Sequence, residues 1–270
     1  MIIQHNIAAI NSYRNLGVNQ SGLNKNLEKL SSGYRINRAG DDAAGLAISE
    51  SMRSQINGLN QATKNAQDAV GLIQTLEGAL TETHSMLQRL TTLASQSANG
   101  TYNSIARNNL RLEVEQLRQE IDRIAKNTDF NGIKPLGGVV DKMTFQIGPS
   151  KEETILVSGG VMTSANLKLD TINITERAGG NAAINVIKTA INDVSTYRAK
   201  LGAAQNRLEH TINNLKVSSE NITAAESRIR DTDMADEITA FTKNNILLQA
   251  SQSMLAQSNS VPQSILSLLS

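Results

Sequence analysis

The stretch that most constrains the fold is a heptad column in residues 181–230. Every seventh residue from position 187 is aliphatic: Ile187, Val194, Leu201, Leu208, Leu215, Ile222 and Ile229. The column three residues earlier is apolar in part and is interrupted by Arg198, Gln205, Ser219 and Glu226. A period of seven sustained without proline predicts one long helix with a narrow apolar seam within the molecule. Roughly fifty residues at about 1.5 Å each would give a rod of about 75 Å.

The chain before this rod predicts three more helices. Residues 2–30 space their aliphatic side chains mostly three, four and seven apart, which indicates an amphipathic helix; a frayed terminal helix is the alternative. Residues 43–98 carry a second heptad column, which Asn99-Gly100 ends. Residues 105–127 are strongly charged, with one aliphatic face. We expect the second and third helices to pack around the rod as a small antiparallel bundle.

The region between the third helix and the rod differs in character. Residues 143–147 alternate apolar and polar side chains, and 154–157 continue the pattern after a turn that contains Pro149. This pattern predicts a β-hairpin at about 140–158. Residues 158–180 are rich in Gly, Ser and Thr, and we expect them to be the least ordered segment.

Both ends of the chain are apolar and short of charge. A last helix is expected at about 234–258, capped by Asp231 or Asp233, and an apolar tail follows it. Neither end can bury its apolar side chains alone, so the sequence predicts an intermolecular interface. The positions expected in that interface are Ile3, Ile7, Ile10, Leu23, Leu27, Phe241, Leu248, Leu255, Leu266 and Leu269.

Composition limits the classes of function. The 270 residues include 26 basic and 25 acidic side chains, which argues against nucleic acid or an anionic membrane as the main partner. Aromatic residues make up only 3%, so a thick globular core is not expected. The absence of cysteine excludes disulfides and thiolate chemistry. Neither a membrane-spanning run nor a cleavable signal peptide is recognised, and ordinary secretory rules would keep the protein inside the cell.

The sequence shows no pattern typical of catalysis or metal binding. His5, His84 and His210 stand singly in separate predicted helices, and no phosphate-binding loop or nucleophile motif occurs. Asp41 and Asp42 lack a nearby histidine or third carboxylate, so helix capping is preferred to metal binding. We therefore expect no catalytic, cofactor or metal site, no cofactor, and a protein that is not an enzyme.

Several segments closely resemble bacterial flagellin. They include MIIQHNIAAINSYRNL, LSSGYRINRAGDDAAGLAISESMRSQINGL, NAQDAVGLIQTLEGAL, LQRLTTLASQSANGT, DFNGIKPL, LGAAQNRLEHTINNL and NNILLQASQSMLAQSN. The resemblance covers about 1–160 and 180–270. Tyr34 stands where a leucine is common, and Arg38, Gly40 and Ser270 also depart from the familiar pattern. None of these departures changes the assignment.

The resemblance implies an architecture. Residues 1–40 and 232–270 would pair as an inner-core coiled coil. Residues 41–231 would form an outer-tube helical rod with the hairpin, and 158–180 would be a minimal variable region without outer domains. The expected fold class is mainly α: long antiparallel helices forming a terminal coiled coil and a helical bundle rod, with one small β-hairpin.

The resemblance also implies a function and partners. The chain would polymerise into the extracellular bacterial flagellar filament for motility, after export by the flagellar type III apparatus without a cleaved signal peptide. Residues 234–270 would bind a flagellin export chaperone beforehand. Filament cap and hook–filament junction proteins would be further partners, and neither nucleic-acid binding nor membrane insertion is expected.

The segment LQRLTTLASQ matches an immune epitope of the family. In flagellins that vertebrate toll-like receptor 5 detects, an Arg and a Leu here and a Glu on the next helix matter. The matching residues are Arg89, Leu93 and Glu113, while Thr92 stands where a Glu is common. The competing interpretation is that Arg89 and Leu93 serve the subunit interface.

Two alternative functions remain open at this point. A hook–filament junction protein shares the terminal patterns, although the agreement in 43–127 and 234–259 favours flagellin. An intracellular helical scaffold would explain the heptads but not the charge-poor ends.

Overall fold

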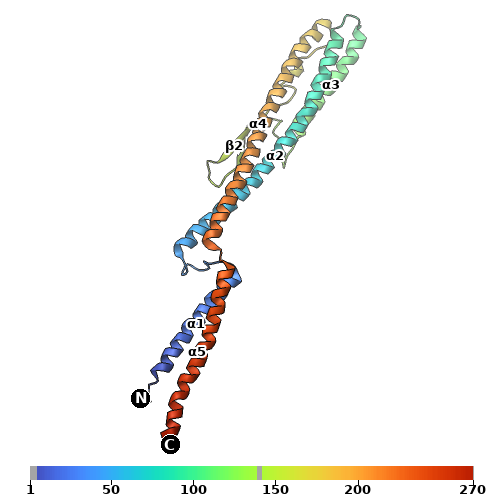
Figure 1. Cartoon of the computed structure of the whole chain (residues 1–270). Coiled ribbons are helices and arrows are strands. Elements are labelled where there is room, and N and C mark those ends of the chain that lie inside the picture. The colour runs from blue at the N-terminus through green and yellow to red at the C-terminus, as the bar shows by residue number, and fades with distance from the viewer. Residues whose placement is uncertain (1–4, 139–141, 270) are drawn as a thin grey trace. The chain divides into compact units, whose positions relative to one another are not determined.

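The computed structural model describes residues 5–138 and 142–269, with 265–269 as backbone alone (Figure 1). Its elements are α1 (Ile7–Ser32), α2 (Ala43–Ala98), α3 (Ser104–Asn127), β1 (Lys142–Gln146), β2 (Thr154–Ser158), the 3-10 helix η1 (Leu169–Thr171), α4 (Arg177–Arg230) and α5 (Met234–Leu269). The mainly α class with one small antiparallel sheet is therefore confirmed.

Side-chain caps and one glycine set several helix limits. Asn6 and Asn103 each accept a hydrogen bond from a first-turn backbone N–H, at the starts of α1 and α3. Gly33 ends α1 in the left-handed conformation, with φ at 73°. Asp42 caps α2 and Asp233 caps α5, so the second member of each predicted acidic pair is the cap.

Helix α5 is longer than the sequence predicts. It continues past the expected end near residue 258, through Pro262, to Leu269. Proline in a helix removes one N–H donor and crowds the carbonyl four residues earlier, which usually ends or kinks the helix. That carbonyl belongs to Ser258, and it accepts a hydrogen bond from Asn6 Nδ2 at 2.7 Å. The missing helical donor is thus replaced from α1.

The chain divides into two compact units. One contains residues 1–56 and 220–270, and the other contains 57–219. Helices α2 and α4 contribute to both units. The expected division into 1–40 with 232–270 and 41–231 follows the breaks between helices instead, and it stays a prediction.

The core of unit 57–219 lies among α2, α3 and α4, which run side by side (Figure 1). Leu80 and Leu87 of α2 and Ile121 of α3 are fully buried there. The heptad column of α4 faces this core, and its buried members are Ile187, Val194, Leu201, Leu208 and Leu215. Ile222 and Ile229, which lie in the other unit, are half-buried. Each fully buried aliphatic side chain contributes about 1.5–3 kcal/mol, so this column is a main source of stability.

Strands β1 and β2 form the predicted hairpin. They pair antiparallel, with Met143 opposite Val157. Met143, Ile155 and Val157 are buried, whereas Leu156 on the opposite face is 58% exposed. The turn packs against α2 at Gly58, where a Cβ would lie only 2.9 Å from Cβ of Pro149. The alternation of apolar and polar residues in the sequence therefore predicts which face of the hairpin is buried.

The segment 158–180 is largely irregular between β2 and α4, but it packs closely against the helices. Ser97 Oγ donates a hydrogen bond to the Ile174 carbonyl at 2.6 Å. Tyr197 OH donates to the Ser158 carbonyl at 3.1 Å, and its ring lies against Gly160. Burial raises the pKa of Tyr197 to about 12. The buried side chains of the segment include Met162, Leu167, Leu169 and Ile174.

Candidate functional site

The two terminal helices, α1 and α5, pair antiparallel along a narrow seam (Figure 1). Each helix contributes one apolar and one polar column at intervals of seven, and these side chains are buried or half-buried. The apolar columns contain Leu16, Leu23 and Leu30 on α1 and Phe241, Leu248 and Leu255 on α5. The polar columns contain Ser12, Asn19 and Asn26 on α1 and Asn244, Ser251 and Ser258 on α5.

Polar contacts set the register of this seam. Asn19 Nδ2 donates a hydrogen bond to Ser251 Oγ at 2.8 Å. A Cβ at Gly22 would lie 3.1 Å from Asn244 Nδ2, so the glycine allows a close approach of the two helices. Asn26 Nδ2 is buried and has no hydrogen-bond partner in the described part of the chain. A polar column of this kind weakens a helix pair but specifies its alignment.

The residues predicted for an intermolecular interface fall into three groups. Exposed on α1, at 60, 57 and 47%, are Ile7, Ile10 and Leu27. Half-buried in the seam within the chain are Leu23, Phe241, Leu248 and Leu255. Outside the described residues, or outside the described side chains, are Ile3, Leu266 and Leu269.

The structure adds further exposed apolar side chains to this helix pair. They are Tyr13 and Val18 on α1, and Met234, Ile238, Ile246, Leu247, Met254 and Val261 on α5. A signal for them exists in the sequence, because Leu247, Met254 and Val261 are seven residues apart and directly precede the seam column. Two adjacent apolar columns on one helix indicate two covered faces.

These exposed side chains lie on more than one side of the pair. On α1, Tyr13 and Leu27 stand four residues after a position of the apolar column. On α5, Leu247 and Met254 stand one residue before a position of its apolar column. In an antiparallel pair these heptad positions flank the seam on opposite sides. Ile246 lies two residues before its column and faces away from the seam. One neighbour on one side therefore cannot cover all of them.

Much of this surface lacks charge. The charged residues of α5 are Asp236, Glu237 and Lys243, and none occurs in 244–269. Burying a charged side chain costs several kcal/mol unless it is paired. Covering the 244–269 stretch with another protein surface avoids that cost.

The segments that connect α1 to α2 and α4 to α5 are hydrogen-bonded to each other. The backbones of 33–35 and 230–232 exchange two hydrogen bonds, of 2.7 and 3.0 Å. The Arg230 guanidinium lies 4.7 Å from the Tyr34 ring centroid, and its Nη1 lies 2.6 Å from Glu50 Oε1. The hydrogen bond from Arg230 lowers the pKa of Glu50. Arg230 thus joins both connections to the start of α2.

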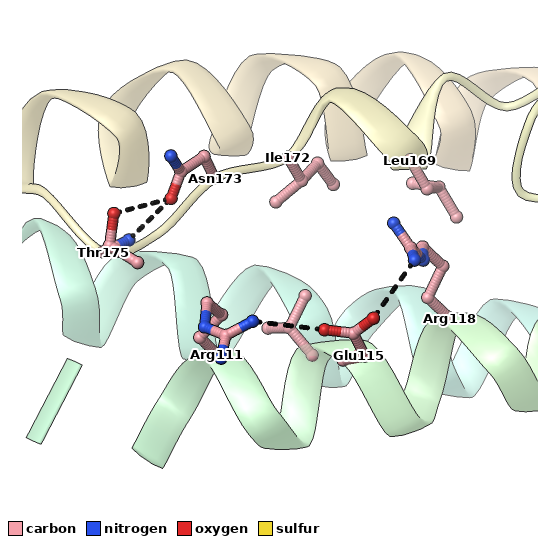
Figure 2. A pocket seen from close by; sticks show the side chains of 8 residues that line it. Arg111, Glu115, Arg118, Leu169, Ile172, Asn173 and Thr175 are labelled. Carbon is pink, nitrogen blue, oxygen red and sulfur yellow. Dashed lines mark hydrogen bonds and ion pairs between the residues drawn. The ribbon is translucent and has the colours of Figure 1, made fainter. Parts of the chain in front are cut away.

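A groove of about 380 Å³ lies between α3 and residues 169–175 (Figure 2). Glu115 accepts hydrogen bonds from Arg111 at 3.2 Å and Arg118 at 3.4 Å, and Arg118 also lies 3.5 Å from Asp170. These opposite charges neutralise one another, and no paired nucleophile and base lines the groove. Among the described residues, no three His, Asp or Glu side chains gather as a metal site, and no helix could span a membrane.

Two family models match the chain. The bacterial flagellin N-terminal helical region matches residues 3–141, and the bacterial flagellin C-terminal helical region matches 184–269. The chain belongs to the bacterial flagellin family. A flagellin of Halalkalibacterium halodurans is 52% identical, and the flagellar filament 33 kDa core protein of Treponema phagedenis is 47% identical, each over the full length of both chains. The crystal structure of Bacillus cereus flagellin is similar with a TM-score of 0.52 and 32% identity, covering 60% of this chain and 94% of that one.

Membership in the family establishes the general function. This flagellin is a structural subunit of the bacterial flagellar filament, which is extracellular, and it is not an enzyme. Flagellins polymerise to form that filament. The relatives favour this function over a hook–filament junction protein or an intracellular scaffold.

Two of the residues implied for receptor recognition lie side by side on the surface of this flagellin. Arg89 Nε of α2 donates a hydrogen bond to Glu113 Oε1 of α3 at 2.7 Å, which raises the pKa of Arg89. Leu93, one turn further along α2, is fully buried in the core. The exposed part of the implied epitope is therefore the Arg89–Glu113 ion pair, with Leu93 beneath the surface.

Proposed function

We propose that the exposed apolar side chains of α1 and α5 are the main contacts between flagellin subunits and that this pair builds the inner core of the filament. Residues 41–231 then form the outer tube. The observation that carries the proposal is the spread of exposed apolar side chains over several sides of the α1–α5 pair. A helix that is apolar on most sides is stable in water only when neighbours surround it.

The two flanks of the seam support an open polymer rather than a closed dimer. Tyr13 and Leu27 lie on one flank, and Leu247 and Met254 lie on the other. A subunit with two unlike apolar surfaces forms heterologous contacts, and such contacts continue as a helical filament when the rotation does not close. The charge-free stretch 244–269 suits complete burial among neighbours.

Substitution of Met254 tests this interface. We expect Met254→Lys to raise the critical concentration for polymerisation roughly tenfold or more, because every contact would bury an unpaired ammonium group. The purified chain is polymerised in ammonium sulfate, which strengthens apolar burial, and the filaments are counted by electron microscopy. Met254→Leu conserves volume and apolarity and is the matched control, expected to polymerise like the parent. Normal filaments from Met254→Lys would exclude this surface from the interface.

The same surface is suited to other partners before and after assembly. An export chaperone binds residues 234–270 and covers the exposed apolar side chains of α5 until the chain leaves by the flagellar type III apparatus, without signal cleavage. The filament cap and the hook–filament junction protein bind at the two filament ends, where a terminal subunit lacks one neighbour. Loss of chaperone co-purification after deletion of 235–270 tests the first contact.

Vertebrate toll-like receptor 5 is a further partner, and Arg89 with Glu113 forms the contact that the resemblance implies. Leu93 acts indirectly, by holding this part of α2 against the core. We expect Arg89→Ala to reduce receptor activation roughly fivefold or more, the effect of losing about 1 kcal/mol, in a reporter-cell assay. Arg123→Ala is the matched control, because Arg123 is also exposed and paired, with Glu120 on its own helix. Equal losses from both substitutions would contradict a specific contact.

A further inference from the structure

The start of α1 and the end of α5 share a hydrogen bond at the position where a proline interrupts the regular bonding of α5. In a regular helix the Ser258 carbonyl would accept from the N–H of residue 262, but Pro262 has no N–H. Asn6 Nδ2 donates to this carbonyl at 2.7 Å. Without Asn6 the carbonyl would lack both its regular helical N–H donor and this side-chain donor, which favours a kink or an end of the helix at the proline.

Asn6 uses both ends of its side-chain amide. Its Oδ1 accepts from the Ala9 N–H at 3.1 Å and caps α1, while its Nδ2 serves the carbonyl of Ser258. The Asn6 side-chain amide therefore caps the first turn of α1 and also supplies a donor to the carbonyl that Pro262 leaves without its helical N–H. The two contacts constrain each other, because the amide can satisfy both only when the start of α1 lies against residue 258.

We propose that Asn6 is a positioning residue that couples the order of the two chain ends: the turns of α5 after Ser258 become a continuous helix when the start of α1 docks. This coupling is a property of the chain itself. Filament assembly, the established function of the family, enters only as one readout. The exposed side chain of Val261 is then presented on a helix only in a completed α1–α5 pair.

Asn19 provides an internal comparison. It lies in the same polar seam, and its Nδ2 donates to Ser251 Oγ at 2.8 Å and reaches the Leu247 carbonyl at 3.4 Å. That carbonyl lies in an uninterrupted part of α5, where the N–H of residue 251 is its regular helical donor. Asn19 is therefore a seam contact without a proline to compensate.

A double-mutant cycle on the full chain tests the coupling. Asn6→Ser keeps a capping hydroxyl but lacks the long amide donor, and Pro262→Ala restores the missing helical N–H. We expect Asn6→Ser to increase hydrogen exchange in 255–264 roughly three- to tenfold when Pro262 is present, the range that one lost hydrogen bond gives. Combined with Pro262→Ala, the same substitution should change exchange less than about twofold. Asn19→Ser should have the same effect in both backgrounds.

The exchange is measured in the soluble chain and in filaments grown in sulfate, together with the critical concentration. An Asn6→Ser chain that polymerises poorly should be rescued by Pro262→Ala. Equal effects of Asn6→Ser with and without the proline, or failure of the rescue, would overturn the coupling. Free exchange of 255–264 in the parent in both states would overturn it as well. Failure of the parent to polymerise would count against the filament function instead, and the cycle in the soluble chain would still decide the coupling.

Discussion

The contacts of Arg230 could not be predicted from its position at the end of α4. Its guanidinium lies over Tyr34 and reaches Glu50, although these residues are far apart in the sequence. Tyr34 is also the position at which the resemblance to flagellins leads us to expect a leucine. The aromatic ring gives the Arg230 side chain a partner that leucine does not offer, because an aromatic face attracts a cation.

The ring of Tyr34 can be tested separately from its bulk. We expect Tyr34→Leu to weaken the contact between the 33–35 and 230–232 backbones by about 0.5–1 kcal/mol, the usual size of an exposed cation–π interaction. Tyr34→Phe keeps the aromatic face and should retain most of it. Hydrogen exchange of peptides covering 30–36 and 228–233 measures both variants. Identical exchange in the Leu and Phe variants would show that the ring contributes no electrostatic attraction.

At the scale of elements, the spacing of aliphatic residues predicted α2, α3 and α4 to within a few residues because their determinants are local. The end of α5 could not be predicted in this way. The donor that compensates for Pro262 is Asn6, the N-cap of α1, which is 252 residues away in the sequence from the acceptor, Ser258. The packing of segment 158–180 could not be predicted for a similar reason: composition cannot show that Ser97 and Tyr197 donate hydrogen bonds to its backbone.

The buried heptad column of α4 predicts that one charged side chain placed in it strongly lowers the stability of unit 57–219. We expect Leu208→Glu to destabilise unit 57–219 by about 3 kcal/mol or more, because Leu208 is fully buried and a carboxylate there would have no partner. Arg207→Glu adds the same group at the exposed neighbouring position and should change stability by no more than about 0.5 kcal/mol. Thermal unfolding followed by circular dichroism compares the two. A normal melting temperature for Leu208→Glu would show that the column is not part of the core.

Over the whole molecule, buried and exposed apolar side chains are distributed unevenly. Unit 57–219 has a continuous core of its own, whereas the α1–α5 pair leaves many of its apolar side chains exposed. The sequence predicted an intermolecular surface at the ends, but it did not separate residues of the seam from residues that face outward. That separation depends on how α1 and α5 are aligned, which heptad positions alone leave open.

Deletion of 235–270 tests this unequal distribution. We expect the shortened chain to form no filaments, because it lacks the apolar surface of α5 and leaves the seam face of α1 uncovered. Its residues 57–219 should stay helical and unfold cooperatively, since their core contains no residue of the deleted segment. Electron microscopy and circular dichroism measure the two outcomes. Filaments from the shortened chain, or loss of helix in 57–219, would contradict this division of roles.

The uncharged stretch 244–269 has a consequence for proton linkage. Association depends on pH only where groups bind protons differently in the free and associated states. No side chain in this stretch titrates. The side chains of this stretch therefore contribute no pH dependence to the free energy of association. Acid can weaken an assembly of this chain only through ionisable groups elsewhere, such as Glu50 beside Arg230.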